Sequence, residues 1–91
     1  MSIVQLTDGS GQWFNPETSQ EWSDRSEHGG WVLYRTKSGR WILRIWSCWA
    51  DSADSYEEIS AEDAAKRWLA TEPDRAEVPE GLEEHVAELE I

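Results

Sequence analysis

The segment 31–49 carries the strongest hydrophobic pattern in the chain. Two runs rich in aromatic and branched side chains are separated by a short polar stretch that ends in Gly39. Such a pattern is typical of a β-hairpin. Two registers fit it: a three-residue loop that pairs Thr36 with Arg40, and a two-residue loop that pairs Lys37 with Arg40. We favour the first register, because it requires a positive φ only at Gly39.

In the favoured register, the two-residue period of a strand divides this hairpin into two faces. One face, called the apolar face, collects Trp31, Leu33, Trp41, Leu43 and Ile45. The other face mixes apolar, aromatic and basic side chains, namely Val32, Tyr34, Arg40, Ile42, Arg44 and Trp46. We expect the apolar face to be covered by a helix.

The segment 60–72 provides that helix. Ser60 suits the N-cap, and Asp63 follows at the third helical position, as in a shortened capping box. An apolar stripe then recurs at helical spacing through Ala61, Ala64, Ala65, Trp68 and Leu69. The pattern predicts that this helix lies across the sheet, with Trp41, Leu43 and Trp68 at the centre of the core.

The remaining segments give weaker signals. A first small hairpin is predicted from 3–6 and 13–14 around an Asp-Gly-Ser-Gly turn. Asn15 as N-cap and Pro16 at the first helical position favour a short helix or turn over 16–24. A last helix over about 79–90 has only a thin apolar stripe of Leu82, Val86 and Leu89.

These elements predict an α+β fold, with an antiparallel sheet of three or four strands centred on the 31–49 hairpin. The helix 60–72 packs on one face of the sheet, and a short acidic helix ends the chain. The 91 residues fit one domain. Residues 1–72 make its α+β body, and residues 73–91 make an acidic extension or helix of the same domain.

Charge is distributed unequally along the chain. Residues 1–50 hold five acids and five bases, whereas residues 51–91 hold fourteen acids and three bases, so the second part carries the whole net charge of −11. The chain has one cysteine, no apolar stretch long enough to span a membrane, and no leader pattern at its start. We therefore expect a cytoplasmic protein that has no membrane partner.

No catalytic or cofactor motif accompanies this charge. His28 and His85 lack a nearby cysteine or a second histidine at metal-ligand spacing, so we expect no metal site. Cys48 is interpreted as a small core or half-buried residue rather than a nucleophile. The glycines after Asp8 form a plain turn, because no Lys-Ser/Thr follows them as in a phosphate-binding loop. We expect no enzyme activity and no cofactor.

The acidic second part is the first candidate site. Its carboxylates are Glu72, Asp74, Glu77, Glu80, Glu83, Glu84, Glu88 and Glu90. A solvated face that only serves solubility accounts for them. The functional hypothesis is that carboxylates along a rigid surface imitate phosphates, and so occupy the basic groove of a nucleic-acid-binding protein.

The mixed face of the hairpin is the alternative site. Tyr34, Arg40, Arg44 and Trp46 are suited to stacking on a ligand or on nucleic-acid bases, with Arg35 and Lys37 near the tip. The net charge of −11 opposes direct binding of nucleic acid. The structural alternatives are that arginine stems cover tryptophans, or that the acidic helices neutralise the arginines.

Four motifs resemble a group of small uncharacterised bacterial proteins. They are Asp-Gly-Ser-Gly-x-Trp-Phe at 8–14, Leu-Tyr-Arg-Thr-x-x-Gly-Arg-Trp at 33–41, Trp-Ser-x-Trp at 46–49, and Tyr-x-x-Ile-Ser followed by Ala and Trp-Leu at 56–69. This resemblance implies no activity, cofactor or site residue. Only by type, as a small acidic α+β chain, the protein is similar to phage proteins that inhibit host defence, including anti-CRISPR proteins.

The sequence thus favours a non-enzymatic module that binds a basic protein surface, and it leaves the oligomeric state open. The alternatives are a ligand- or nucleic-acid-binding module that uses the hairpin face, and an accessory protein with no intrinsic activity.

Overall fold

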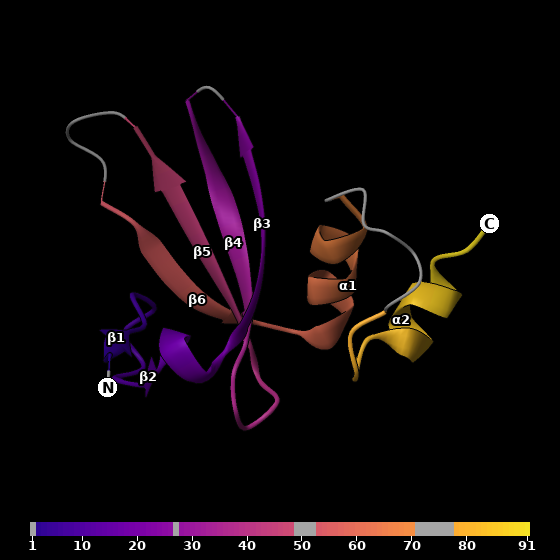
Figure 1. Ribbon diagram of the computed structural model, residues 1–91, viewed down its shortest axis with the longest axis horizontal. Helices are drawn as coiled ribbons and strands as arrows, with labels where there is room; N and C mark the ends of the chain where they lie inside the picture. Colours follow the sequence, from indigo (N-terminus) through magenta and orange to yellow (C-terminus); the bar gives the residue numbers. More distant parts are fainter. Residues whose placement is uncertain (1, 27, 49–52, 71–77) are drawn as a thin grey trace.

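A computed structural model describes residues 2–26, 28–48, 53–70 and 78–91. Its centre is a four-stranded antiparallel sheet, in the order β3 (Gln20–Ser26), β4 (Gly29–Arg35), β5 (Trp41–Ser47) and β6 (Ser55–Ile59). A two-stranded sheet of β1 (Val4–Gln5) and β2 (Trp13–Phe14) lies to one side, and the helices α1 (Ala61–Ala70) and α2 (Glu83–Glu88) lie to the other (Figure 1). The predicted α+β class and the short C-terminal helix are confirmed.

The turn between β4 and β5 has the favoured register. The Thr36 amide donates to the Arg40 carbonyl at 2.8 Å, and the Gly39 amide donates to the Thr36 carbonyl at 2.9 Å. Gly39 has φ of 86°, a conformation that a glycine adopts without a steric penalty. The three-residue loop is therefore confirmed, and it fixes which side chains share a face.

The apolar face packs against the helices, as predicted, although Arg35, opposite Trp41, also belongs to this face. Leu33 and Trp41 from the sheet form one buried cluster with Ala64, Ala65 and Trp68 of α1 and with Leu82. Leu43 is also buried on this face, at 3% exposure, whereas Ile45 near the end of β5 is 42% exposed. The Ser60 hydroxyl caps α1 by accepting from the Asp63 amide at 3.1 Å.

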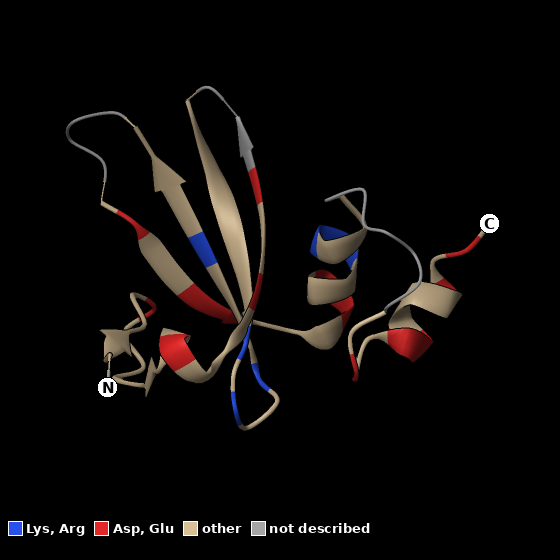
Figure 2. Cartoon of the chain, in the orientation of Figure 1, with Lys and Arg blue, Asp and Glu red and all other residues tan. Residues whose placement is uncertain are grey.

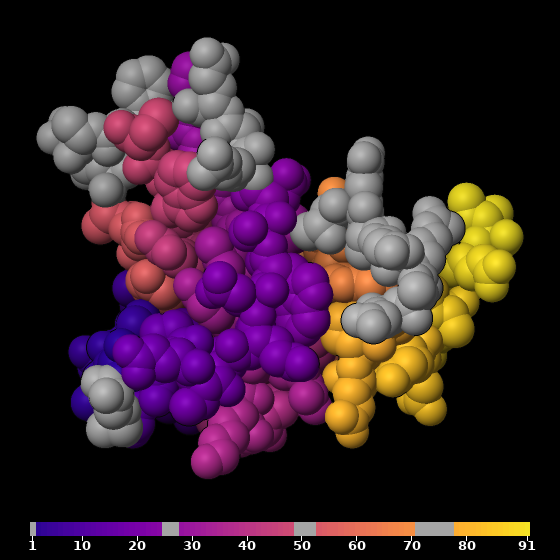
Figure 3. Space-filling model, in the orientation of Figure 1, coloured from indigo at the N-terminus to yellow at the C-terminus, as the bar shows by residue number. Residues whose placement is uncertain are grey.

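The small N-terminal hairpin covers the end of the mixed face that lies nearest the β4–β5 turn (Figures 1 and 3). Leu6 and Phe14 form a second buried cluster with Tyr34 and Ile42. The rings of Phe14 and Tyr34 have centroids 5.0 Å apart, within the usual range of aromatic pairs. The predicted first hairpin is therefore confirmed, with Val4 opposite Phe14 and Gln5 opposite Trp13.

The predicted helix over 16–24 is wrong beyond its first turn. The Asn15 side chain accepts from the Glu17 amide at 3.0 Å and caps a 3-10 turn, η1 (Pro16–Thr18). From Gln20 the chain is extended as β3 and pairs along its whole length with β4. This pairing places Trp22 against the buried cluster and within 5.9 Å of the Trp41 ring, centroid to centroid, which a short helix would not do.

Two further expectations need correction. The last helix does not extend over 79–90: Gly81 has φ of 93°, which is not a helical conformation, and only Glu83–Glu88 is helical. Cys48 is exposed and lies just beyond the end of β5, not in the core.

No helix among the described residues is long and apolar enough to cross a membrane.

Candidate functional site

The acidic surface that the structure describes comprises Glu80, Glu83, Glu84 and Glu88. Glu80 lies in the turn before α2, and the other three lie on the helix. All four are exposed. The segment is held in place by Leu82, which is fully buried in the main cluster, and by the partly buried Val86. An exposed acidic edge is thus fixed to the core by an apolar anchor.

The carboxylates of this acidic surface have one basic neighbour among the described residues, the imidazole of His85. No Lys or Arg among the described residues lies within ion-pair distance of any of the four. The imidazole of His85 lies beside them, with Nδ1 3.9 Å from Glu88 Oε2. In Figure 2, α2 carries red but no blue. Like charges four residues apart, as at Glu84 and Glu88, repel each other mildly.

Three described acids elsewhere in the second part of the chain form ion pairs, while none joins Glu57 or Asp63 to a described residue. Asp54 binds Arg44, Glu58 binds Arg40, and Glu62 lies 3.8 Å from Lys66. Ion pairs with arginine or lysine therefore form at β6 and α1, whereas none forms around α2 among the described residues.

The structure describes only part of the predicted acidic site. Glu72, Asp74 and Glu77 lie outside the described residues. Because α2 has six residues rather than twelve, Glu80 precedes the helix and Glu90 follows it. Of the five described carboxylates of the predicted site, three thus lie on the helix and two flank it.

The alternative site does not form an open face. Tyr34 is 5% exposed beneath Phe14, so its ring is not free to stack on a ligand. Arg44 donates from Nε and Nη2 to Asp54 Oδ2 at 2.9 and 2.6 Å, and its guanidinium lies 5.7 Å from the centre of the Tyr56 ring. Trp46 is half-buried at the other end of β5 from Arg40.

The electrostatics of this face follow from its pairing. Burial acts to lower the pKa of Arg44, but its hydrogen bonds with Asp54 and Tyr34 outweigh that effect and raise the pKa. Burial also raises the pKa of Tyr56. Arg44 and Arg40 are thus neutralised by Asp54, just before β6, and by Glu58 in β6. The sequence interpretation that the acidic helices neutralise them is wrong.

Arg40 makes the second ion pair of this face. It donates from Nε and Nη2 to the two carboxylate oxygens of Glu58 at 2.7 and 2.5 Å, and from Nη2 to Gln12 Oε1 at 3.0 Å. The hydrogen bonds to Arg40 lower the pKa of Glu58, and the same bonds raise the pKa of Arg40. The pair is fork-shaped and links β5 to β6.

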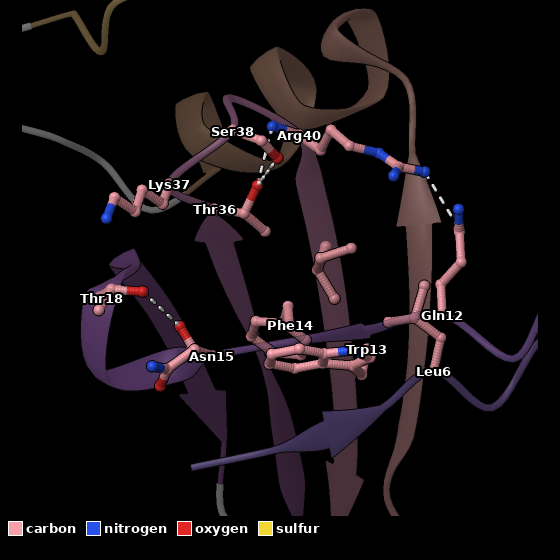
Figure 4. Close-up of a pocket in the computed structure, with 11 residues that line it drawn as sticks. Leu6, Gln12, Trp13, Phe14, Asn15, Thr18, Thr36, Lys37, Ser38 and Arg40 are labelled. Carbon is pink, nitrogen blue, oxygen red and sulfur yellow. Dashed lines mark hydrogen bonds between the residues drawn. The ribbon is translucent and has the colours of Figure 1, made fainter. Parts of the chain in front are cut away.

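A pocket of about 450 Å³ opens beside Arg40, between the N-terminal hairpin and the β4–β5 turn. Sequence reasoning missed it, because its walls come from segments that are distant in the chain. Trp13 and Phe14 line one side, and Thr36, Lys37 and Ser38 line the other (Figure 4). The only signal in the sequence was the basic hairpin tip.

The loop after Asp8 is the plain turn that was expected. Asp8 Oδ1 accepts from the Ser10 amide at 2.9 Å, and hydrogen bonding to Ser10 lowers the pKa of Asp8. The Ser10 hydroxyl in turn accepts from the Gln12 amide at 3.2 Å. The amides of Ser10 and Gln12 are thus used within the loop rather than turned outward to bind a phosphate.

Among the described residues, no cluster of three or more His, Cys, Asp or Glu is arranged to hold a metal ion. Comparisons with protein-family models, with curated proteins and with solved structures each find no match to this chain.

Proposed function

We propose that this chain is a non-enzymatic protein-binding module whose acidic surface, at Glu80, Glu83, Glu84 and Glu88, binds a basic surface on another protein. The observation that carries the proposal is the segregation of charge. Arg40, Arg44 and Lys66 contact acids in their own neighbourhood, while the carboxylates around α2 face solvent and pair with no Lys or Arg of the described residues.

The geometry suits attraction rather than proton transfer. A carboxyl group that acts as a general acid is usually held in apolar surroundings that favour its neutral form. The four side chains of the acidic surface are instead exposed. Their combined field steers a basic partner during encounter, and a partner cation placed near Glu84 and Glu88 relieves their mutual repulsion.

The anchor gives this surface a defined shape. Leu82 is fully buried against the cluster that contains Trp68 and Leu33. The helix then advances about 6 Å between Glu84 and Glu88, at 1.5 Å per residue. Carboxylates held at fixed spacing lose less conformational freedom on binding than those on a free tail.

The finer form of the proposal is that the partner is a nucleic-acid-binding protein and that the carboxylates occupy its phosphate sites. Cytoplasmic location belongs to the same proposal, because it brings the chain together with such partners and suits a single cysteine. A partner bound in this way should release the chain when duplex DNA is added. Failure of DNA to compete would refute the mimicry and leave the protein-binding role standing.

The test is quantitative capture from a bacterial lysate by the immobilised chain and two charge variants. The first variant carries Glu83→Gln, Glu84→Gln and Glu88→Gln. The matched control carries Glu21→Gln, Asp24→Asn and Glu57→Gln, which remove the same charge from exposed side chains of the sheet. The proposal predicts a salt-sensitive partner that is lost with the first variant and retained by the control. Equal capture by both variants would contradict it.

A further inference from the structure

The pocket beside Arg40 differs in charge from the rest of this acidic protein. The whole chain has 19 acids and 8 bases. The residues that line the pocket include the bases Lys37 and Arg40 and no Asp or Glu among the described residues. A site free of carboxylates in such a chain favours an anionic occupant.

The two cations are not equivalent. Arg40 is engaged by Glu58 and Gln12, so most of its charge is already compensated. Lys37 is exposed, and no ion pair joins it to any described residue. In Figure 4, Lys37 lies on the side of Thr18 and Asn15, whereas Arg40 lies on the side of Gln12. Lys37 is therefore the cation that is available to a ligand.

The turn also offers a hydroxyl donor. Thr36 Oγ1 and Ser38 Oγ lie 3.0 Å apart, and Thr36 Oγ1 accepts from the Arg40 amide at 3.0 Å. Each hydroxyl carries one hydrogen, so whichever of the two donates to the other, the second hydrogen remains available. This donor and the Lys37 ammonium come from the same three-residue loop, which suits one shared anionic group.

The opposite wall is aromatic. Trp13 is 51% exposed, an unusual state for the largest apolar side chain in a domain of this size, and Phe14 is buried beside it. Trp13 lines the pocket and is packed in neither core cluster. Planar rings stack readily on such a face.

The size of the pocket and its position complete the description. About 450 Å³ lies within the range of roughly 300–1,000 Å³ that is typical of small-molecule sites. The molecule measures 40 Å along its longest axis, and α2 lies at the opposite end of that axis from β1 and β2 (Figure 1). Because the Debye length is about 8 Å at physiological salt, the acidic surface repels an anion in this pocket only weakly.

We propose that this pocket binds a small aromatic anion, with the ring against Trp13 and a carboxylate or phosphate group at Lys37 and the Thr36–Ser38 hydroxyl pair. This site is separate from the acidic surface and does not depend on the proposed function.

The test is an NMR titration of the ¹⁵N-labelled chain with two pairs of probes. 4-Hydroxybenzoate and phenol examine a carboxylate, and adenosine 5′-monophosphate and adenosine examine a phosphate. The proposal predicts that at least one anion shifts the amides of 12–18 and 36–40, and binds about fivefold or more tightly than its neutral counterpart, which is the effect of one exposed ion pair. The pair that responds identifies the anionic group.

Two matched variants decide whether Lys37 is responsible. Lys37→Gln should weaken binding of the anion about fivefold, and Lys66→Gln, at an exposed lysine of α1, should leave it unchanged. The proposal is overturned if the neutral and anionic probes bind equally, or if the two lysine variants bind alike. It is also overturned if no probe shifts these amides at about 10 mM, where even a weak site of millimolar affinity would be filled.

Discussion

Leu82 is the residue that attaches the acidic surface to the core, so Leu82→Ala examines the architecture behind the proposed function. Leu82 has 0% exposure and contacts the cluster of Leu33 and Trp68. Truncation to alanine removes about three methylene equivalents, or about 2.4 kcal/mol of transfer free energy at ~0.8 kcal/mol each. The cavity left behind brings the expected loss to about 2.5–4.5 kcal/mol.

That loss is large for this chain. A 91-residue domain has a total free energy of unfolding of about 5–14 kcal/mol, at ~0.05–0.15 kcal/mol per residue. The assay is urea denaturation followed by tryptophan fluorescence, since Trp41 and Trp68 lie in the affected cluster. Amide hydrogen exchange over Glu83–Glu88 shows in addition whether α2 detaches before the sheet unfolds.

Leu89→Ala is the matched control, because it makes the same chemical change in the same segment. Leu89 follows α2 and is 37% exposed, so its truncation should cost less than about 1 kcal/mol. The reasoning is refuted if Leu82→Ala and Leu89→Ala have the same denaturation midpoint and the same exchange rates in α2. The acidic surface would then not be anchored by Leu82.

Two further predictions concern the hairpin and its ion pair. Gly39→Val should lower the free energy of unfolding by about 1–3 kcal/mol, because φ of 86° strains a β-branched residue, although a Cβ there meets only ordinary contacts. Gly39→Asn should lower it less. Equal denaturation midpoints for the two variants would contradict the turn geometry. Glu58→Gln should lose less than about 1 kcal/mol at pH 7, because the ion pair with Arg40 is largely exposed. The pKa of Glu58 is lowered in the folded state from 4.5, so the stabilisation is present above that pH and is lost as the pH falls through the folded value. The difference in the free energy of unfolding between wild type and Glu58→Gln should therefore shrink in acid. The control Glu57→Gln, at an exposed neighbour, should have nearly the stability of wild type at any pH. A stability difference for Glu58→Gln that does not change with pH would argue against the ion pair.

The parts of the fold that the sequence predicts are those with strong local signals. The 31–49 hairpin, its register and its two faces follow from a two-residue period and one well-placed glycine. Helix α1 follows from Ser60, Asp63 and a clear apolar stripe. In each case the local pattern and the tertiary packing favour the same structure, which is why the prediction holds.

The errors arise where a local signal competes with long-range pairing. Asn15 and Pro16 start a helical turn, but pairing with β4 then overrides it and makes β3. Strand β6 was not foreseen, although Tyr56 and Glu58 alternate with Ser55, Glu57 and Ile59 in a two-residue period. In this period Asp54 and Glu58 fall on one face. That face adjoins Arg44 and Arg40 of the neighbouring strand, so recognition of β6 would have predicted both ion pairs.

The candidate sites depend on information that the sequence does not contain locally. The excess of acids is visible from composition, but which acids are neutralised depends on the register between β5 and β6. The pocket requires Trp13 and Lys37 to meet across the N-terminal hairpin and the β4–β5 turn. Sequence separation hides both features, because neither is built within one element.

The most direct test of the central claim is to map the captured partner onto the ¹⁵N-labelled chain by NMR. The account predicts that the largest amide shifts fall over 80–90, and that they disappear with the Glu83→Gln, Glu84→Gln and Glu88→Gln variant, while the control with Glu21→Gln, Asp24→Asn and Glu57→Gln retains them. Shifts concentrated instead at 12–18 and 36–40 or along β3, with the residues around α2 unchanged, would contradict the claim that the acidic surface is the binding site.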